Sequence, residues 1–384
     1  MENKYNNFDL LKLNDKLLQG IYLYGFSQPS KIQIQGIESI STGNDCLLQS
    51  QSGTGKTATY LLGMLHRLYL LEGTNNTCMI ITPTRELANQ VYEVAFNLAK
   101  FTDYKIVKCI GGIDIHTNKQ EIKNASIIIG TIGRIYHMIT DKKINLNNLK
   151  LIVLDEVDEL LYDGINDKLE YIFNNSDLTK TQTILISATI TYNVFNLSKK
   201  IMTKNPIKIL LKNEEIVINL ISQFYLDIEI EDQKFDTLLD LYNLISAAQT
   251  IIFCNTIKKI EWLDEKLKEN NFTITAIHSN MTQIERNNIV QEFRDGKTRL
   301  LLTTDLLSRG IDIPQVNMVI NYDLPSNKEA YVHRIGRCGR FNKKGIAISF
   351  IKTSDIYDTK FLNRLKHVYK INIQEMPESF DNYL

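Results

Sequence analysis

Residues 50–57 read SQSGTGKT, and they closely follow the short apolar run Cys46–Leu48. A helical pattern begins near Ala58, so the stretch connects a strand to the start of a helix. This context and the spacing of glycine, lysine and threonine are typical of a phosphate-binding loop. One residue departs from the usual pattern, because Ser50 stands where that loop commonly begins with glycine. The alternative is a glycine turn that contains a lysine by chance.

The chemistry of such a loop is carried by its backbone. Gly53 and Gly55 allow positive φ values, which turn successive N–H groups inward at a helix end where the dipole favours an anion. In this arrangement Lys56 reaches the β- and γ-phosphates, and Thr57 holds a Mg²⁺ ion. The stretch therefore predicts a site for a magnesium nucleotide.

The length of 384 residues predicts two domains of ordinary size. Hydrophobic residues make up 43% and charged residues 23%, as in a soluble globular protein. The 44 basic and 44 acidic residues cancel, so the overall charge does not indicate a nucleic-acid partner. Any nucleic-acid site has to come from the local arrangement of residues.

The five cysteines are far apart and form no CxxC pair, which disfavours a disulfide framework or a zinc site. The beginning MENKYNNFDL lacks the basic and then apolar pattern of a signal peptide, and no apolar run reaches membrane-spanning length. We expect an intracellular protein, with nucleus and cytoplasm left open.

Apolar runs rich in Ile, Val and Leu alternate with helical segments, which is typical of α/β domains with parallel sheets. The pattern breaks at the charged cluster Lys212–Glu215 and then restarts without a second phosphate loop. We therefore predict a first domain over 1–211, a linker over 212–218 and a second domain over 219–384. Trp262 is expected in the core of the second domain. The predicted strands are Cys46–Leu48, Cys78–Thr82, Ile106–Ile110, Ser126–Gly130, Leu151–Leu154, Thr183–Ile186, Ile207–Leu210, Ser222–Leu226, Thr250–Phe253, Thr273–Ile277, Arg299–Thr303, Val316–Asn321 and Gly345–Phe350.

Residues 151–158, LIVLDEVD, bring carboxylates to the carboxyl end of a predicted strand, where α/β sheets bind ligands. Asp155 suits a magnesium ion through its water shell, and Glu156 suits an attacking water. The alternative is a solvated acidic helix start. At the end of the next strand, Ser187 and Thr189 are predicted to link Asp158 to the second domain, or else form a helix N-cap.

Residues 333–340, HRIGRCGR, place three arginines and a histidine among glycines. Arginine is a permanently charged fork that suits phosphates. We expect Arg337 and Arg340 to act as arginine fingers, because the second domain has no phosphate loop of its own. The competing interpretation is a basic surface patch for RNA that also uses Lys343 and Lys344.

With these motifs in order, the chain resembles DEAD-box RNA helicases, and within them the branch of eukaryotic translation initiation factor 4A and its exon-junction paralogue. The match runs from about Phe26 to the C-terminus. It rests on GFSQPSKIQ near 26–33, SQSGTGKT, PTREL at 83–87, Gly111–Gly112, TIGR at 131–134, DEVD at 155–158, SAT at 187–189, IIFCNT at 251–256, Gln283 with Arg286, TTDLLSRGID at 303–312, INYDLP and HRIGRCGR.

The resemblance implies two RecA-like domains and assigns site residues. Adenine and ribose would be bound by Phe26, Gln33 and Asp312, and the phosphates by Ser52, Gly53, Thr54, Gly55, Lys56 and Thr57. RNA would be held by Pro83, Thr84, Arg85, Gly112, Thr131, Gly133, Arg134, Gln283, Arg286 and Thr304. The coupling residues would be Asp158, Ser187, Thr189 and His333, and the catalytic residues Lys56, Asp155, Glu156, Arg337 and Arg340, with Mg²⁺ at Thr57 and Asp155.

Several positions depart from the family pattern. Val157 replaces an alanine, and Ile132 replaces a proline whose preset φ would favour the RNA-binding turn by about 0.4–1 kcal/mol. Ser279 and Asn280 stand where a glycine and an acid are expected after His278. The tail MPESFDNYL also differs from the usual ending.

The resemblance implies an ATP-dependent RNA helicase that closes its two lobes on Mg-ATP and single-stranded RNA, as a monomer with protein regulators and no membrane. The pathway would be translation initiation or mRNA processing. An alternative is an ATP-gated RNA clamp in an exon-junction-like assembly that unwinds little. A third possibility is a DNA helicase, which the motif set disfavours.

Overall fold

The structure is a computed structural model, and it describes residues 7–49, 55–71, 76–162, 166–202, 205–210, 221–245, 249–305, 316–338, 345–369 and 371–377. The chain divides into two compact units, an N-terminal unit, Met1–Leu211, and a C-terminal unit, Lys212–Leu384. The segment expected as the linker, 212–218, lies outside the described residues.

The N-terminal unit is built on a parallel sheet of seven strands. All seven strands predicted for this half are present, with ends shifted by at most two residues. They are β1 (Cys46–Gln49), β2 (Thr77–Thr82), β3 (Ile106–Cys109), β4 (Ile127–Thr131), β5 (Leu149–Leu154), β6 (Gln182–Ser187) and β7 (Ile207–Leu210). Their order in the sheet is β3-β4-β2-β5-β6-β1-β7, and every neighbouring pair is parallel.

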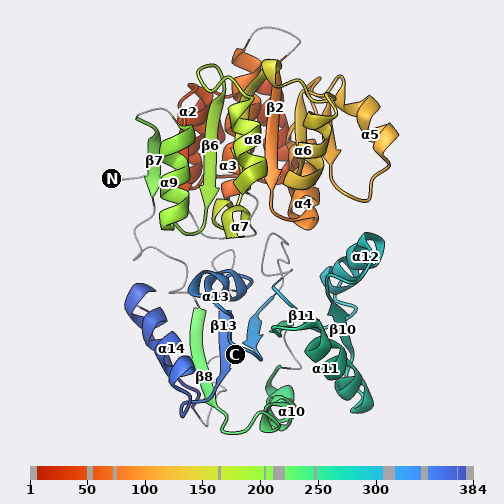
Figure 1. Cartoon of the computed structure of the whole chain (residues 1–384), viewed down its shortest axis with the longest axis vertical. Helices are drawn as coiled ribbons and strands as arrows, with labels where there is room; N and C mark the ends of the chain where they lie inside the picture. Colours follow the sequence, from red (N-terminus) through yellow and green to blue (C-terminus); the bar gives the residue numbers. More distant parts are fainter. Residues whose placement is uncertain are drawn as a thin grey trace. The chain divides into compact units, whose positions relative to one another are not determined.

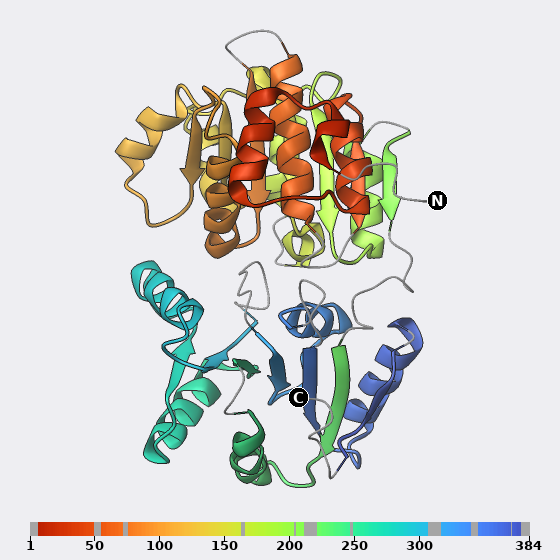
Figure 2. The same ribbon diagram turned by 180° about the vertical axis from the view of Figure 1, so that it is seen from behind.

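The helices of this unit are η1 (Phe8–Leu11), α1 (Asp15–Tyr24), α2 (Lys31–Ser41), α3 (Lys56–Leu70), α4 (Arg85–Leu98), α5 (Ile115–Ile122), α6 (Ile132–Thr140), η2 (Leu146–Asn148), α7 (Val157–Tyr162), α8 (Asn166–Asn174) and α9 (Tyr192–Ile201). Helices α6, α8 and α9 cover one face of the sheet in Figure 1, and α1 to α4 cover the other face in Figure 2.

Both faces of this sheet are apolar because successive strand residues point to opposite sides. In β5, Leu151 and Val153 pack with helices α1 to α4, whereas Ile152 and Leu154 pack with helices α6 to α9. All four side chains are at most 1% exposed. This two-sided burial explains why the strands are nearly continuous apolar runs in the sequence.

The C-terminal unit contains a second parallel sheet of seven strands. Six of them were predicted from the sequence, and the seventh, β14, was not. The strands are β8 (Ile221–Asp227), β9 (Thr250–Phe253), β10 (Ile274–Ile277), β11 (Leu300–Thr303), β12 (Met318–Asn321), β13 (Gly345–Ile351) and β14 (Ile373–Glu375). Their order is β10-β11-β9-β12-β13-β8-β14, all parallel.

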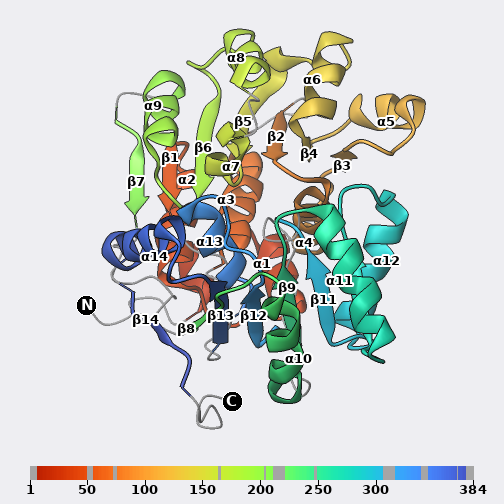
Figure 3. The same ribbon diagram turned by 60° about the horizontal axis from the view of Figure 1, so that its bottom comes forward.

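The helices of the C-terminal unit are α10 (Gln233–Ile245), α11 (Ile257–Glu269), α12 (Gln283–Arg294), α13 (Lys328–Ile335) and α14 (Ile356–Tyr369). Side chains of α12, α13 and α14 share one core with the sheet, and those of α10 and α11 share the other. Figure 3 shows α14 beside β14 at one edge of this sheet and α11 and α12 near β11 toward the other. Each unit is thus a RecA-like α/β domain with helices on both faces of a parallel sheet.

The expectation for Trp262 was wrong, because its side chain is 44% exposed and lies edge-on to Phe235, with ring centroids 5.7 Å apart. Helix α11 buries Ile260, Leu263 and Leu267, and Trp262 lies outside that stripe.

All five cysteines are free thiols, and each is buried. Three belong to the N-terminal unit and two to the C-terminal unit. Burial raises the pKa of each thiol, for Cys46, Cys109, Cys254 and Cys338 to about 12. Within the described part of the chain, every helix is too short or too polar to cross a bilayer.

Candidate functional site

The start of helix α3 has the geometry of a phosphate-binding turn. Gly55 has φ +90° and is the N-cap of the helix, where a side chain is strained. Lys56, the first helical residue, is buried, and its Nζ has no hydrogen-bond partner among the residues that the structure describes. Ser52, Gly53 and Thr54 lie outside the described residues. The described half of the loop therefore places the buried Lys56 ammonium group at the N-terminus of α3.

Gln33 lies directly against this turn. Its Oε1 accepts a hydrogen bond from the Ser30 N–H over 2.7 Å, as part of a capping box that starts helix α2. A Cβ atom on Gly55 would lie 2.6 Å from the Gln33 Nε2, so the amide group occupies the space that a side chain there would need. Phe26 is half-buried nearby in sequence, with its ring 5.0 Å from that of Tyr24.

Asp155 and Glu156 follow strand β5 at its carboxyl end, and both are buried. The Asp155 N–H donates to the Ile81 carbonyl over 2.9 Å, which extends the β2–β5 pairing by one residue. Glu156 has φ +50°, a left-handed conformation that costs a non-glycine residue about 1–3 kcal/mol. Its Oε2 is buried and has no hydrogen-bond partner in the described part of the chain. The Glu156 carboxylate at the end of this central strand is thus carried by a strained backbone.

Burial raises the pKa of Asp155 to about 6, and the neighbouring charge of Glu156 adds to the increase. The charge of Lys56 and the hydrogen bond from Tyr60 act in the opposite direction. Two buried carboxylates and one buried ammonium group therefore share a small region between β5 and α3. Such a region favours binding of groups that neutralise it, because unpaired buried charges are costly.

Tyr60 is a site residue that the sequence analysis missed. Its hydroxyl donates to Asp155 Oδ2 over 2.7 Å, and the side chain is fully buried. The signal available in the sequence was only its position, one helical turn after Lys56.

Asp158 and Thr189 are brought together by α7 and the loop after β6. Asp158 Oδ2 accepts hydrogen bonds from the Thr189 hydroxyl over 2.6 Å and from the Thr189 N–H over 3.1 Å. Ser187 is buried at the end of β6, and its hydroxyl donates to the Thr189 carbonyl over 2.7 Å. The three residues form a fixed polar link between two adjacent strand ends.

Arg85 and the glycines after β3 form a second group, which also lies at the carboxyl ends of strands of this sheet. A Cβ on Gly111 would lie 2.4 Å from Arg85 Nη2, so the guanidinium lies against the glycine backbone. Gly112 has φ +93° and is exposed. Thr84 caps helix α4, because its side-chain oxygen accepts a hydrogen bond from the Leu87 N–H over 3.2 Å. Pro83, which precedes it, is half-buried.

Arg134 lies on helix α6 after β4. Its Nη2 donates to the Ile113 carbonyl over 2.9 Å, and its Nη1 is buried without a hydrogen-bond partner among the described residues. Thr131 is the N-cap of α6, and Gly133 has open space where a Cβ would lie. The structure therefore places Arg134 beside the loop that also carries Gly112.

Two departures from the family pattern are absorbed by the core. Ile132 is the first residue of α6, a position that proline favours, and its side chain is 4% exposed in an apolar cluster. Val157 is the first residue of α7 and is fully buried in the same cluster. The methyl groups of Val157 thus pack in the apolar core.

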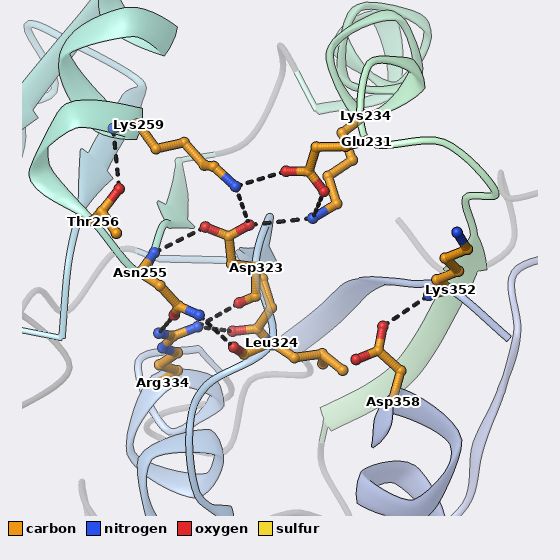
Figure 4. A network of polar contacts seen from close by, with 11 residues as sticks. Glu231, Lys234, Asn255, Thr256, Lys259, Asp323, Leu324, Arg334, Lys352 and Asp358 are labelled. Carbon is orange, nitrogen blue, oxygen red and sulfur yellow. Dashed lines mark hydrogen bonds and ion pairs between the residues drawn. The ribbon is translucent and has the colours of Figure 1, made fainter. Parts of the chain in front are cut away.

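In the C-terminal unit, helix α13 is anchored through Arg334, which the sequence analysis did not single out. Arg334 is fully buried and donates to Asn255 Oδ1 over 2.8 Å and to the Asp323 carbonyl over 2.7 Å (Figure 4). Its guanidinium also lies 5.2 Å from the Phe253 ring centroid. His333 and Arg337 flank this anchor and are buried, and the Arg337 Nε donates to the His333 carbonyl over 3.3 Å.

The Asp323 carboxylate is the centre of a charged network at the carboxyl ends of β9 and β12 (Figure 4). It accepts hydrogen bonds from the Asn255 N–H over 3.0 Å, from Lys259 over 2.8 Å and from Lys234 over 3.2 Å. Glu231 pairs with both lysines, at 2.6 Å and 2.8 Å. Burial would raise the pKa of Asp323, but the hydrogen bonds and the two lysine charges hold it below its ordinary value.

The remaining predicted residues of this unit are distributed over other strand ends. Thr304 follows β11, with its carbonyl accepting the Thr303 hydroxyl over 3.0 Å, and Arg286 is buried on α12. Gln283 starts α12, and its side chain is outside the described part. His278 is buried, while Ser279 and Asn280 are exposed. The predicted positions Asp312 and Arg340 lie outside the described residues.

Comparison with known proteins gives two family matches along the chain. The family described as DEAD/DEAH box helicase matches residues 30–197, and the one described as helicase conserved C-terminal domain matches residues 233–342. The ATP-dependent RNA helicase eIF4A of Kluyveromyces lactis is 45% identical over 375 residues, covering 97% of this chain and 93% of the relative. The protein of the same name from Candida glabrata is 44% identical over 370 residues, covering 96% and 92%.

Solved structures give a consistent result. Dbp5 of S. cerevisiae, bound to RNA and ADP BeF3, has a TM-score of 0.89 at 35% identity and covers 98% of this chain and 97% of that chain. Mss116p, bound to ssRNA and AMP-PNP, has a TM-score of 0.88 at 25% identity, with coverages of 99% and 82%.

Proposed function

The chain belongs to the DEAD-box RNA helicase family of ATP-hydrolysing enzymes, and we propose that its two units close together on Mg-ATP and single-stranded RNA. Closure would separate or remodel short stretches of RNA locally. The units involved would be the ATP-binding domain over 1–211 and the second helicase domain over 219–384, joined by the linker at 212–218.

One observation carries this proposal. Lys56 presents a buried Nζ without a hydrogen-bond partner among the described residues, next to a left-handed Gly55. A buried ammonium group that lacks a partner is costly, and a phosphate at the helix N-terminus would neutralise it. The relatives named as ATP-dependent helicases support ATP as the nucleotide.

The residues present fit a magnesium ion. Hard oxygen donors are what Mg²⁺ requires, and Thr57 and the buried Asp155 offer them. The unpartnered Oε2 of Glu156 adds negative charge close by. When bound, the ion would neutralise developing charge on the phosphates. Thr57 and Asp155 would hold it, largely through water.

The other ATP contacts extend from the same loop. Phe26 and Gln33 would bind adenine, and the placement of the Gln33 amide against Gly55 supports that role. Ser52, Gly53 and Thr54 would donate backbone N–H groups to phosphates, and Asp312 would bind the ribose.

Hydrolysis would use Glu156 to orient the attacking water, with its strained backbone aiming the carboxylate. Arg337 and Arg340 would stabilise the charge of the transition state. Arginines in this role are worth about 10³–10⁵ in rate in GTPases. The anchoring of α13 through Arg334 supports the assignment for Arg337, because it fixes the helix that ends two residues earlier.

RNA would be held by loop residues at the carboxyl ends of strands in both units. In the N-terminal unit these are Pro83, Thr84, Arg85, Gly112, Thr131, Gly133 and Arg134, and in the C-terminal unit Gln283, Arg286 and Thr304. The buried Nη1 of Arg134, unpartnered among the described residues, supports a phosphate contact. Such contacts position a strand without reading its bases.

Coupling between ATP and RNA would pass through Asp158, Ser187 and Thr189 in one unit and His333 in the other. The hydrogen bonds from Thr189 to Asp158 support a rigid link between the ATP side and the next strand end. If both ligands favour the closed form, each tightens the binding of the other, typically by about 1–3 kcal/mol.

The role supported by the relatives is in translation initiation, since several are named as initiation factor 4A. An RNA clamp with slow hydrolysis is the other outcome to be tested. The lifetime of the ATP-loaded protein on RNA, measured with candidate partners present, separates the two: a clamp remains bound far longer with ATP than with ADP.

The decisive experiment measures ATP turnover with and without single-stranded RNA, and with single-stranded DNA as a second arm. We expect stimulation by RNA and not by DNA. Glu156→Gln should lower turnover by at least about 100-fold. Glu93→Gln, the same change on the exposed surface of α4, serves as the matched control. Turnover that RNA leaves unchanged would contradict the proposed coupling.

A further inference from the structure

The hydroxyl of Tyr60 contacts one of the two residues proposed to hold magnesium. It donates to Asp155 Oδ2 over 2.7 Å. The tyrosine is fully buried, so water does not compete for this bond. Helix α3 and the turn after β5, from two distant parts of the chain, are thereby tied together.

The register of helix α3 creates this arrangement. Residues three and four positions apart lie on the same helix face, so Tyr60 shares a face with both Thr57 and Lys56. That face is opposite the carboxyl end of β5, where Asp155 begins the acidic turn. Tyr60 is therefore the residue on α3 that joins the phosphate turn to the acidic turn.

Both oxygens of the Asp155 carboxylate are held by donors from the protein. Oδ2 accepts the Tyr60 hydroxyl, and Oδ1 accepts the Glu156 N–H over 3.0 Å. With one donor on each oxygen, the plane of the carboxylate is determined. Each oxygen keeps a second lone pair, which remains available to a metal-bound water.

We propose that Tyr60 is a positioning residue for the magnesium nucleotide, which fixes the orientation of the Asp155 carboxylate. This inference rests on the proposed function, because it assigns a supporting role at the same site. Residues that orient metal ligands typically contribute 10- to 100-fold to metal affinity or activity.

The competing explanation is that the hydroxyl only satisfies a buried carboxylate. Removing it would then lower the stability of the fold without changing the dependence on magnesium. The two explanations differ in one measurable quantity, the Mg²⁺ concentration that half-saturates nucleotide binding and turnover.

Tyr60→Phe removes the hydroxyl and keeps the ring. A suitable control is Tyr331→Phe in the C-terminal unit, where another fully buried tyrosine hydroxyl bonds to the neutral Gln223 Oε1 over 3.0 Å. Each variant removes one buried hydrogen bond from a tyrosine hydroxyl, but only the bond lost in Tyr60→Phe involves the acidic turn. Thermal unfolding of both proteins reports any loss of stability separately.

The test titrates Mg²⁺ at fixed concentrations of a fluorescent ADP analogue and, separately, of ATP. For Tyr60→Phe we expect the half-saturating Mg²⁺ concentration to rise by about 10-fold. The affinity for the ADP analogue in EDTA should stay unchanged, and Tyr331→Phe should match the wild type in both. Equal Mg²⁺ dependence in Tyr60→Phe and wild type overturns the inference.

The binding titration distinguishes failure of this inference from failure of the proposed function. If the wild type binds the analogue with Mg²⁺ but RNA does not stimulate its ATPase, the proposed coupling fails and the role of Tyr60 is still decided by the binding curves. If the wild type shows no Mg²⁺-dependent nucleotide binding, both ideas are overturned.

Discussion

The Nε atom of Arg334 donates to Asp305 Oδ1 over 2.6 Å, which joins helix α13 to the segment that follows strand β11. The guanidinium is fully buried, while the Asp305 side chain is 32% exposed. Because the same guanidinium also contacts Asn255 and the Asp323 backbone, one side chain connects three strand ends. Arg334 thus fixes the position of α13, the helix that carries His333, through contacts within the protein alone.

Replacing this arginine should destabilise the C-terminal unit. Lysine keeps the charge but lacks the fork that makes these contacts simultaneously, so Arg334→Lys leaves buried acceptors unpaired. We expect a loss of about 3 kcal/mol in the free energy of unfolding. Urea denaturation followed by circular dichroism measures it. Lys200→Ala, which breaks an exposed pair with Glu170, should change stability little, and similar losses in both variants would contradict the anchoring role.

Acid should weaken the network around Asp323. Burial acts to raise its pKa, but the bonds from Lys259 and the Asn255 N–H and the charge of Lys234 leave the folded-state pKa below the ordinary 3.8. A carboxyl group with a lowered pKa contributes stability above its unfolded pKa and loses it as the pH falls through the folded value. We expect the melting temperature of the wild type to fall more steeply below about pH 4 than that of Asp323→Asn.

That comparison is made by calorimetry between pH 7 and pH 3. Asp323→Asn should be less stable at pH 7, because Lys234 and Lys259 lose a charged partner. The difference between the two proteins should shrink as the pH decreases. Parallel pH profiles would show that Asp323 is not the group responsible.

A side chain at Gly55 should impair nucleotide binding. Gly55→Ala places a Cβ at φ +90° and 2.6 Å from the Gln33 amide, so both the backbone and the adenine-side residue must shift. We expect a stability loss of about 1 kcal/mol or more, and a rise in the nucleotide Kd of about 10-fold. Isothermal titration with ADP measures the affinity.

Gly296→Ala is the matched control for that variant. Gly296 also has a positive φ, +74°, but nothing lies within 4 Å of its would-be Cβ. It should therefore show the backbone strain without any change in nucleotide affinity. A wild-type nucleotide Kd for Gly55→Ala would contradict the assignment of Gln33 to the nucleotide site.

The bond between Thr189 and Asp158 should contribute both stability and coupling. Thr189→Val removes the hydroxyl donor at 2.6 Å but keeps the N–H donor, so the N-terminal unit should lose about 1–2 kcal/mol. The ratio of RNA-stimulated to basal ATP turnover should fall as well. Thr179→Val removes a similar but exposed hydroxyl bond to Asp177, and it should change neither quantity appreciably. If Thr189→Val has the wild-type free energy of unfolding and the wild-type stimulation ratio, Thr189 is not a coupling residue.

The strands were predictable because they are buried on both faces, which leaves a continuous apolar run that sequence reasoning detects. The runs at 151–154 and 250–253 illustrate this, since every residue in them is buried in the structure. Strand β14 was missed for the corresponding reason. Only Ile373 of its three residues is buried, so the strand leaves no pattern in the sequence.

The site was predictable where a short motif contains the chemistry, as at Lys56 and Asp155. Contacts between distant residues were not. Tyr60 reads as one more apolar position of a helix, since its partner is 95 residues away. In HRIGRCGR the arginines look equivalent, and only the structure commits Arg334 to internal contacts. The left-handed φ of Glu156 was also hidden, because a glutamate gives no sign of that conformation.

The five buried thiols provide the protein with internal reporters of opening. Cys46, Cys78 and Cys109 belong to one unit, and Cys254 and Cys338 belong to the other. A thiol that is buried and protonated reacts with an alkylating reagent only when its surroundings open. Mass spectrometry of alkylated peptides therefore times the opening of each sheet separately, without introducing any label. Adding nucleotide or RNA would then reveal which unit each ligand protects.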